Sequence, residues 1–359
     1  MRSEAGLLAL GPTGRAFPAS SPRQWLDAYG VPDHSGGSAP DSNRLPITTD
    51  LERADGTAGG GPGAVGLPRY VGPAVTDSSD PRSYGVVFDT MADEYDRHRP
   101  GYPEELIDRA CRAAGLADGD RVLEVGCGTG QLTRSLVARG LRVTAVEPGE
   151  NLAALAARIG DNVEFVASRF EDAELPETFA AAFSASAFHW VDPDVSWLCA
   201  ARSLKPGGRL GLIQYCAVAS EETSEDADAL LSALALAAPE LAAQWPPLRD
   251  LDTIMAGAAD RRENISEVWQ WVARQPVARS YAAELFEDAE IAVVPGVIEQ
   301  TADELNALFG TTSVAHRLPS AQRQALEQAN REIEGRLGRP IRSSMLAVLV
   351  TARRARREL

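Results

Sequence analysis

The most informative stretch of the chain is Val122-Leu123-Glu124-Val125-Gly126-Cys127-Gly128-Thr129-Gly130. A short apolar run carrying one acid ends at Val125, three glycines follow at alternate positions, and an amphipathic segment covers 131–139. This order predicts a strand, a tight loop and a helix. Glycines let a backbone approach a ligand closely, and the N–H groups at a helix start suit an anionic group. We therefore expect this stretch to cradle an anionic or zwitterionic ligand.

The spacing of the glycines distinguishes two kinds of nucleotide site. A nicotinamide-dinucleotide fingerprint, G-x-G-x-x-G, counted from Gly126 places its third glycine at position 131, where this chain has Gln131. The observed order is acid-x-G-x-G-x-G, with Glu124 just before the glycines. A second acid, Glu147, ends the next apolar run 23 residues later (147 minus 124). The pattern therefore argues against a nicotinamide dinucleotide.

Apolar runs and helical segments alternate through the middle of the chain. Five runs of strand length are found, at 121–125, 142–147, 163–166, 181–185 and 209–214. Helical patterns separate most of them, and two more helices are expected ahead of them, near 88–95 and from Pro103 to Ala114. Strands that alternate with helices of this length predict an α/β fold with a doubly wound, mostly parallel sheet. Ligands bind beyond the carboxyl ends of such strands.

Four regions are expected along the chain. Residues 1–84 are rich in Gly, Pro, Ser and Asp without periodicity, which predicts a disordered extension. Residues 85–216 form the ligand-binding core, and 217–288 read as a helical insertion that forms a lid over the strand ends. Residues 289–359 supply two closing strands and two helices, which completes a seven-stranded sheet.

Composition limits the partners. A net charge of -16 disfavours nucleic acid, because phosphate binding needs a basic face. No stretch approaches the roughly 20 apolar residues of a membrane span. The four cysteines are widely spaced and show no CxxC pairing, so neither a disulfide framework nor a metal site is predicted. We expect reduced thiols and a cytoplasmic location; oligomeric state is not predicted.

Three motifs in order resemble those of the class I S-adenosylmethionine-dependent methyltransferases. The stretch 122–130 stands where the first motif of that family stands, and Val143-Thr144-Ala145-Val146-Glu147-Pro148-Gly149 stands at the second. The segment Leu204-Lys205-Pro206-Gly207-Gly208-Arg209-Leu210 matches the one before the fifth strand. The resemblance covers about 86–216 and implies a Rossmann-like methyltransferase fold and S-adenosylmethionine as cofactor.

Two further motifs make the chain most similar to the small-molecule branch that includes trans-aconitate methyltransferases. That branch carries Tyr-Asp and Arg-Pro-x-Tyr-Pro ahead of the cradle, here Tyr95-Asp96 and Arg99-Pro100-Gly101-Tyr102-Pro103. It also carries His-Trp after the fourth strand, here His189-Trp190. One departure is Ala180, where the family commonly has an Asp at the start of the fourth strand.

The chemistry of the cofactor assigns roles to the motif residues. The loop amides suit its carboxylate, Glu124 suits its ammonium, and an ionised Glu147 can accept from both ribose hydroxyls. The resemblance implies that Tyr95 and Arg99 close over the carboxylate. For the adenine, Phe170 offers a ring face and Glu171 or Asp172 an acceptor. The predicted cofactor-binding residues are Tyr95, Arg99, Glu124, Gly126, Cys127, Gly128, Gly130, Glu147, Pro148, Phe170, Glu171 and Ser186.

Methyl transfer is an in-line displacement that depends mostly on alignment and exclusion of water. A base is needed only where the acceptor must lose a proton. His189 is the candidate base or acceptor-orienting donor, and it can equally be a wall of the pocket. Trp190, Trp245 and Trp269 are expected to line an apolar pocket for a small acceptor methylated on oxygen or carbon, carboxyl oxygen included.

Two other functions fit the same motifs. A protein can keep the fold and the cofactor site without transferring methyl, and act as a cyclase-like catalyst or a ligand-sensing partner. An intact cradle does not separate this possibility from methyl transfer. RNA or protein methylation is disfavoured by the acidic charge and by the absence of an Asn-Pro-Pro-Tyr-type motif.

Overall fold

The computed structural model describes residues 8–10, 16–18, 88–175 and 178–356. Within the first two ranges, β1 (Leu8–Leu10) and β2 (Ala16–Pro18) pair antiparallel. The rest of the predicted extension 1–84 lies outside the described residues.

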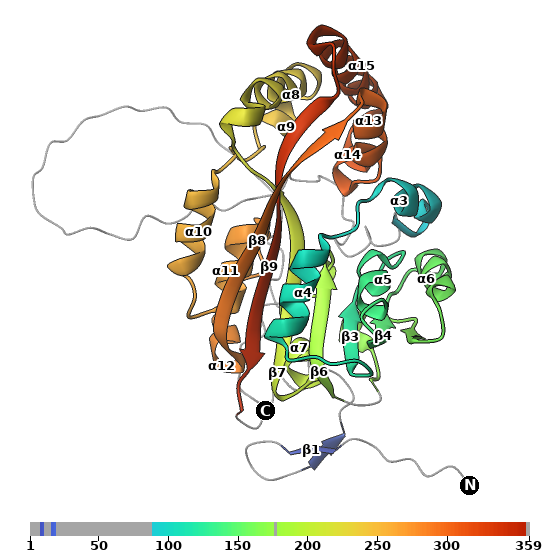
Figure 1. The fold of residues 1–359 in the computed structure, drawn as a ribbon, viewed down its shortest axis with the longest axis vertical. Helices are drawn as coiled ribbons and strands as arrows, with labels where there is room; N and C mark the ends of the chain where they lie inside the picture. The colour runs from blue at the N-terminus through green and yellow to red at the C-terminus, as the bar shows by residue number, and fades with distance from the viewer. Residues whose placement is uncertain (1–7, 11–15, 19–87, 176–177, 357–359) are drawn as a thin grey trace, which may run out of the picture.

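A seven-stranded sheet forms the centre of the molecule, with strand order β5-β4-β3-β6-β7-β9-β8 (Figure 1). Strands β3 to β7 run parallel, and β9 runs antiparallel to both β7 and β8. This confirms the predicted doubly wound, mostly parallel sheet. The strands are β3 (Arg121–Val125), β4 (Arg142–Val146), β5 (Val163–Val166), β6 (Phe179–Ala185), β7 (Leu204–Ala217), β8 (Phe286–Gln300) and β9 (Ile341–Arg354).

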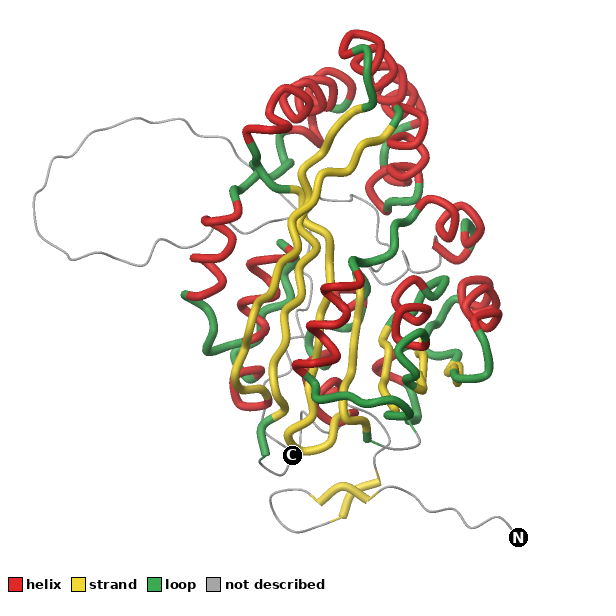
Figure 2. Tube along the Cα trace, viewed as in Figure 1, coloured by secondary structure: helices red, strands yellow, loops and turns green. Residues whose placement is uncertain are grey.

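Helices cover both faces of the sheet (Figure 2). On one face, α4 (Glu104–Ala113) and α5 (Gln131–Val137) pack through Leu106, Ile107 and Leu136 against the sheet. On the other face, α7 (Ser196–Ser203) buries Trp197 completely. Because each strand of a covered parallel sheet is buried on both sides, its sequence reads as a continuous apolar run. Another helix of this part of the chain is α6 (Glu150–Ala156), which follows β4.

The helices predicted as one insertion, 217–288, lie in two places. Three of them share the large apolar cluster that includes Trp197 on the sheet face: α10 (Leu251–Ala259), α11 (Ile265–Ala273) and α12 (Ala282–Leu285). The other two, α8 (Ser224–Ala237) and α9 (Pro239–Ala242), belong to a separate cluster with the last helices of the chain.

That separate cluster, which we call the cap, lies at the far ends of the long strands β8 and β9 (Figure 1). Besides α8 and α9 it contains α13 (Ala302–Gly310), α14 (Ser313–Arg317) and α15 (Ser320–Leu337). Leu234, Leu326 and Ile333 form its own apolar core. The cap therefore combines helices from before and after the closing strands.

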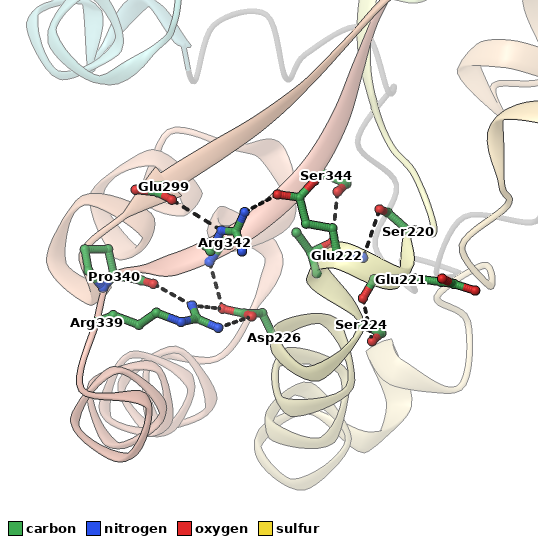
Figure 3. A network of polar contacts seen from close by, with 11 residues as sticks. Ser220, Glu221, Glu222, Ser224, Asp226, Glu299, Arg339, Pro340, Arg342 and Ser344 are labelled. Carbon is green, nitrogen blue, oxygen red and sulfur yellow. Dashed lines mark hydrogen bonds and ion pairs between the residues drawn. The ribbon is translucent and has the colours of Figure 1, made fainter.

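A polar network fastens the cap to the sheet (Figure 3). The carboxylate of Asp226, 1% exposed, accepts hydrogen bonds of 2.8 Å from both terminal nitrogens of Arg339 and from the backbone N–H of Arg342. These bonds hold the pKa of Asp226 below its usual value. Arg342 also pairs with Glu222 and, at 3.3 Å, with Glu299. A buried acid with three donors fixes α8 against the start of β9.

Within the described residues, no helix combines the length and the apolar character needed to cross a membrane.

Candidate functional site

A cavity of about 730 Å³ opens beyond the carboxyl ends of β3, β4 and β6. Its size lies within the roughly 300–1,000 Å³ typical of small-molecule sites. One end is lined by the glycine stretch and the acid ending β4, which we call the cofactor half. The other end, the acceptor half, lies under the cap. The helix α3 (Ala92–His98) contacts the cap helix α13 from the side of the cofactor half. The position agrees with the expected switch point of a doubly wound sheet.

The glycine loop is fixed by local geometry. Gly126 has φ +70°, and a Cβ there would lie 2.4 Å from the Cβ of Ala187. Gly130, with φ +92°, precedes α5, and a Cβ there would lie 2.3 Å from Cδ1 of Ile159. At each position the backbone has a positive φ and there is no room for a Cβ, and only glycine satisfies both conditions. The loop therefore cannot carry a side chain at either point without shifting its neighbours.

The loop amides are used within the chain. Gly126 and Cys127 donate to the carbonyl of Val146, at 2.8 and 3.3 Å, and Gly128 donates to Glu147. This differs from the expectation that these amides serve an anionic ligand. The side chain of Gln131 offers another donor, because its Nε2 is buried in the cavity wall and has no hydrogen-bond partner in the described part of the chain. An unpartnered buried donor of this kind suits a ligand carboxylate.

Glu147 joins the loop to the start of α6. Its Oε2 accepts from the amide of Gly128 and its Oε1 from the amide of Gly149, both at 3.0 Å. Burial raises the pKa of this carboxyl despite the two hydrogen bonds. Each oxygen keeps a further lone pair for a ligand hydroxyl. The geometry therefore permits the predicted binding of a ribose.

Glu124 lies deeper, with 1% of its surface exposed. Its Oε2 accepts from the hydroxyl of Thr133 at 2.7 Å. Burial raises the pKa of Glu124 to about 8, so the acid is largely protonated at neutral pH in the free protein. A ligand ammonium next to it would favour the ionised form.

The segment leading into α3, together with α3, lies over the cofactor half. A Cβ on Gly128 would be 3.9 Å from Tyr95, and the Arg99 guanidinium lies 4.9 Å from the centre of the Tyr95 ring. Arg99 donates from Nε and Nη2 to the hydroxyl and carbonyl oxygens of Thr311, both at 2.9 Å. Within the described ranges it has no carboxylate partner, so it remains available as the counter-charge for an anionic ligand.

Of the predicted adenine contacts, Phe170 and Glu171 line the same half, whereas Asp172 does not line the cavity. Phe170 begins the short helix η3 (Phe170–Asp172) and is 6% exposed. Burial raises the pKa of Glu171, which lies 3.9 Å from Arg169. Cys127 and Pro148 also contribute to the wall, and burial raises the pKa of the Cys127 thiol.

The acceptor half contains residues that the motifs do not assign. The rings of Tyr102 and Tyr215 stack with centres 5.6 Å apart. The hydroxyl of Tyr102 shares a hydrogen bond of 3.1 Å with Ser186, and Tyr215 donates to the carbonyl of Gly101 at 2.8 Å. Only Tyr102 had a sequence signal, the Arg-Pro-x-Tyr-Pro motif. The other new wall residues are Gln214, Ile298, Leu308, Thr312, Ser313 and Met345.

His189 and Trp190 line the cavity from the short helix η4 (Phe188–Trp190), directly after β6. Trp190 packs edge-on against Phe88, with ring centres 5.7 Å apart. Trp245 and Trp269 are not brought into the cavity: Trp269 is fully buried in the core under the sheet, and Trp245 is 40% exposed. Both were predicted as acceptor contacts. Trp269 instead packs in the core, where an aromatic residue of an amphipathic helix fits equally well, and Trp245 lies at the surface beyond the end of α9.

In the described part of the chain, no three His, Cys, Asp or Glu side chains are grouped so that they could hold a metal ion.

Comparison with known proteins agrees with the site's architecture. Residues 123–212 match a family model described as a methyltransferase domain. An uncharacterized methyltransferase of Mycobacterium tuberculosis is 41% identical over 133 residues, which is 37% of this chain and 53% of that protein. A demethylmenaquinone methyltransferase of Tropheryma whipplei is 32% identical over 110 residues, 30% of this chain and 46% of that protein. The chain therefore spans about half the length of these relatives.

Among solved structures, a methyltransferase from Geobacter sulfurreducens in complex with S-adenosyl-L-homocysteine aligns with a TM-score of 0.41 and 16% identity, over 74% of this chain and 97% of that one.

Proposed function

We propose that the chain is a class I S-adenosylmethionine-dependent methyltransferase and that it transfers the methyl group of this cofactor to a small, fairly apolar acceptor. One observation carries the proposal. A single cavity joins a polar, acid-lined half at the glycine loop to a second half walled by aromatic and aliphatic side chains.

The side chains of the cofactor half fit a zwitterionic sulfonium nucleoside. Among the described residues neither Arg99 nor the Nε2 of Gln131 has a carboxylate partner, and both donors suit the carboxylate of the cofactor. Glu124 suits its ammonium and Glu147 its ribose hydroxyls. Bound there, the cofactor supplies an electrophilic methyl carbon. The assignments of Phe170 and Glu171 to the adenine remain part of this proposal.

The acceptor half would align the nucleophile and exclude water. Tyr102 and Tyr215 offer a flat apolar surface, and Ile298, Leu308 and Met345 close the far side. The cap supplies Leu308, so the acceptor is held between the cap and the sheet. Alignment of this kind provides much of the rate enhancement in a one-step displacement. The net charge of -16 supports a small acceptor over a nucleic acid.

The cofactor assignment is tested by calorimetry with S-adenosylmethionine. Glu147→Ala should weaken binding by more than about 100-fold, because two charge-assisted hydrogen bonds are lost, each worth about 1.5–3 kcal/mol. Glu164→Ala is the matched control, since Glu164 is an exposed acid on the neighbouring strand β5. Equal affinity of all three proteins would refute the proposed site.

The transfer itself is tested by screening the protein against neutral phenols, enols, carboxylates and prenylated or polyketide compounds. Formation of S-adenosylhomocysteine that depends on an acceptor supports methyl transfer. Tight cofactor binding with no transfer to any acceptor class would favour the alternative, a cyclase-like catalyst or a ligand-sensing protein on the same fold.

A further inference from the structure

The two ring nitrogens of His189 have different surroundings. Nδ1 is buried and has no hydrogen-bond partner among the residues that the structure describes. The half-buried ring lines the cavity. Because Nδ1 is sealed in the wall, Nε2 is the ring nitrogen left to face the cavity. The indole of Trp190 covers part of the imidazole, with ring centres 4.8 Å apart and planes tilted by 45°. A ligand in the cavity therefore meets the ring at Nε2.

This asymmetry selects one tautomer. A neutral imidazole carries one N–H and one lone pair. An orphaned buried N–H is rarer in proteins than an under-satisfied acceptor, so the proton belongs on the nitrogen that a ligand or water can reach. The neutral ring should therefore carry its proton on Nε2 and leave a bare Nδ1 in the wall.

The same geometry opposes a general base. A base acting through Nε2 needs the proton on Nδ1 and a partner that holds it there, as the acid does in a catalytic triad. Once protonated, the ring would also bury an unpaired N–H at Nδ1. In agreement, burial alone lowers the pKa of His189 to about 4. The titratable groups lining the same cavity from other elements, none of which contributes to this shift, include Tyr95, Arg99, Tyr102, Glu124, Glu147 and Glu171.

We propose that His189 is a neutral Nε2–H donor that orients the methyl acceptor, rather than the base that deprotonates it. The inference rests on the proposed function. It defines an acceptor class: the substrate places an oxygen that accepts a hydrogen bond, such as a carbonyl or ether oxygen, next to the methylated atom. The nucleophile's lone pair forms the bond to the methyl carbon as the carbon–sulfur bond breaks and its electron pair stays on sulfur. Any proton on the nucleophile leaves to solvent.

Nitrogen–proton correlation NMR of the histidine rings tests the tautomer without an acceptor. The sequence has four histidines, and His189→Gln identifies the relevant signals. The protein is saturated with S-adenosylhomocysteine after calorimetry has shown binding, so a failed cofactor site is recognised separately. We expect an Nε2–H tautomer that does not titrate between about pH 5 and 8. An Nδ1–H tautomer, or a midpoint near the ordinary value of about 6.5, would overturn the inference.

Kinetics with any acceptor found in the screen provide the second test. A glutamine amide N–H can take the place of Nε2–H but cannot act as a base. His189→Gln should therefore keep kcat/KM within about 10-fold of the wild type, since one neutral hydrogen bond is at stake. His189→Leu should lose more, and the wild-type profile should be flat through pH 6. A loss of about 100-fold or more in the glutamine variant indicates a base and contradicts the proposal. Wild-type rates in both variants would exclude any orienting role, and the glutamine variant alone decides if the leucine variant does not fold.

Discussion

The two halves of the cavity differ in how the chain builds them. The cofactor half comes mostly from a continuous region in which each strand is followed at once by a site residue, as β3 is by the glycine loop and β4 by Glu147. The acceptor half gathers Tyr102, Gln214, Ile298, Leu308 and Met345 from segments far apart in sequence. The residues of the cofactor half are thus found in short contiguous motifs, whereas the walls of the acceptor half depend on tertiary packing.

The largest effect is expected from a substitution that disrupts the cofactor half and leaves the acceptor half intact. Gly126→Val places a β-branched residue at φ +70° with its Cβ 2.4 Å from Ala187. We expect cofactor binding to fall by more than about 1,000-fold, because the loop must move out of its bound geometry. Calorimetry measures the loss. Gly296→Val is the control, since nothing lies within 4 Å of a Cβ there; equal binding by both variants would contradict the role of the loop.

The converse change fills the acceptor half. Met345→Trp adds bulk to the cavity wall on β9. We expect kcat/KM for the acceptor to fall by about 100-fold, because a misplaced nucleophile can cost that much, while cofactor affinity stays unchanged. Calorimetry with the cofactor alone measures its affinity, and steady-state kinetics measure kcat/KM for the acceptor. A matched loss of cofactor affinity would show that the two halves are not independent.

The buried carboxyl of Glu124 should make cofactor binding depend on pH. The pKa of Glu124 is raised to about 8 in the free protein, and a bound ammonium should keep the carboxylate ionised. Below about pH 8 binding must therefore release a proton, so cofactor affinity should rise up to about 10-fold per pH unit toward pH 8 and then level off. Calorimetry in buffers of different ionisation enthalpy detects the released proton. Glu124→Gln should remove this dependence, and an unchanged pH profile in that variant would refute the assignment.

The raised pKa of Glu124 also predicts how the stability of the free protein depends on pH. A group that binds its proton more tightly when folded stabilises the protein below its folded pKa, relative to higher pH. The Glu124 contribution should therefore be lost as the pH rises from about 4.5 toward about 8. Thermal unfolding of wild type and Glu124→Gln over this range measures it, and the variant should show the smaller decline.

Some features of the fold and the site could be predicted from the sequence, and others depend on tertiary packing. The sheet, the glycine loop and the site positions of Glu124, Glu147 and His189 were predictable, because strand ends of a parallel sheet meet at one edge. The placement of α10 to α12 was not, because amphipathic helices pack on a sheet face or in a lid with the same pattern. Trp269 shows this, since its spacing suited either place and it lies in the core. The sequence position of Gln131 argues only against a dinucleotide site, because the burial of its Nε2 depends on tertiary packing.

The smallest expected effect concerns the link between the halves. Arg99, which follows α3, donates to the hydroxyl of Thr311, the residue that ends α13 in the cap. Thr311→Val keeps the shape and removes one of the two hydrogen bonds, so we expect a 3- to 10-fold rise in the acceptor KM. Thr301→Val, at the start of the same helix, is the control, because it costs the helix its N-cap but leaves Arg99 in place.

If both threonine variants raise the acceptor KM equally, general weakening of α13 explains the effect and the bridge through Arg99 has no special role. If only Thr311→Val does so, the contact transmits the position of α3 to the acceptor half. Hydrogen exchange of α13 with and without S-adenosylhomocysteine then adds the direction of the coupling. Cofactor binding should protect α13 in the wild type and in Thr301→Val more than in Thr311→Val, because the hydrogen bonds of Arg99 to the cap run, among the described residues, to Thr311.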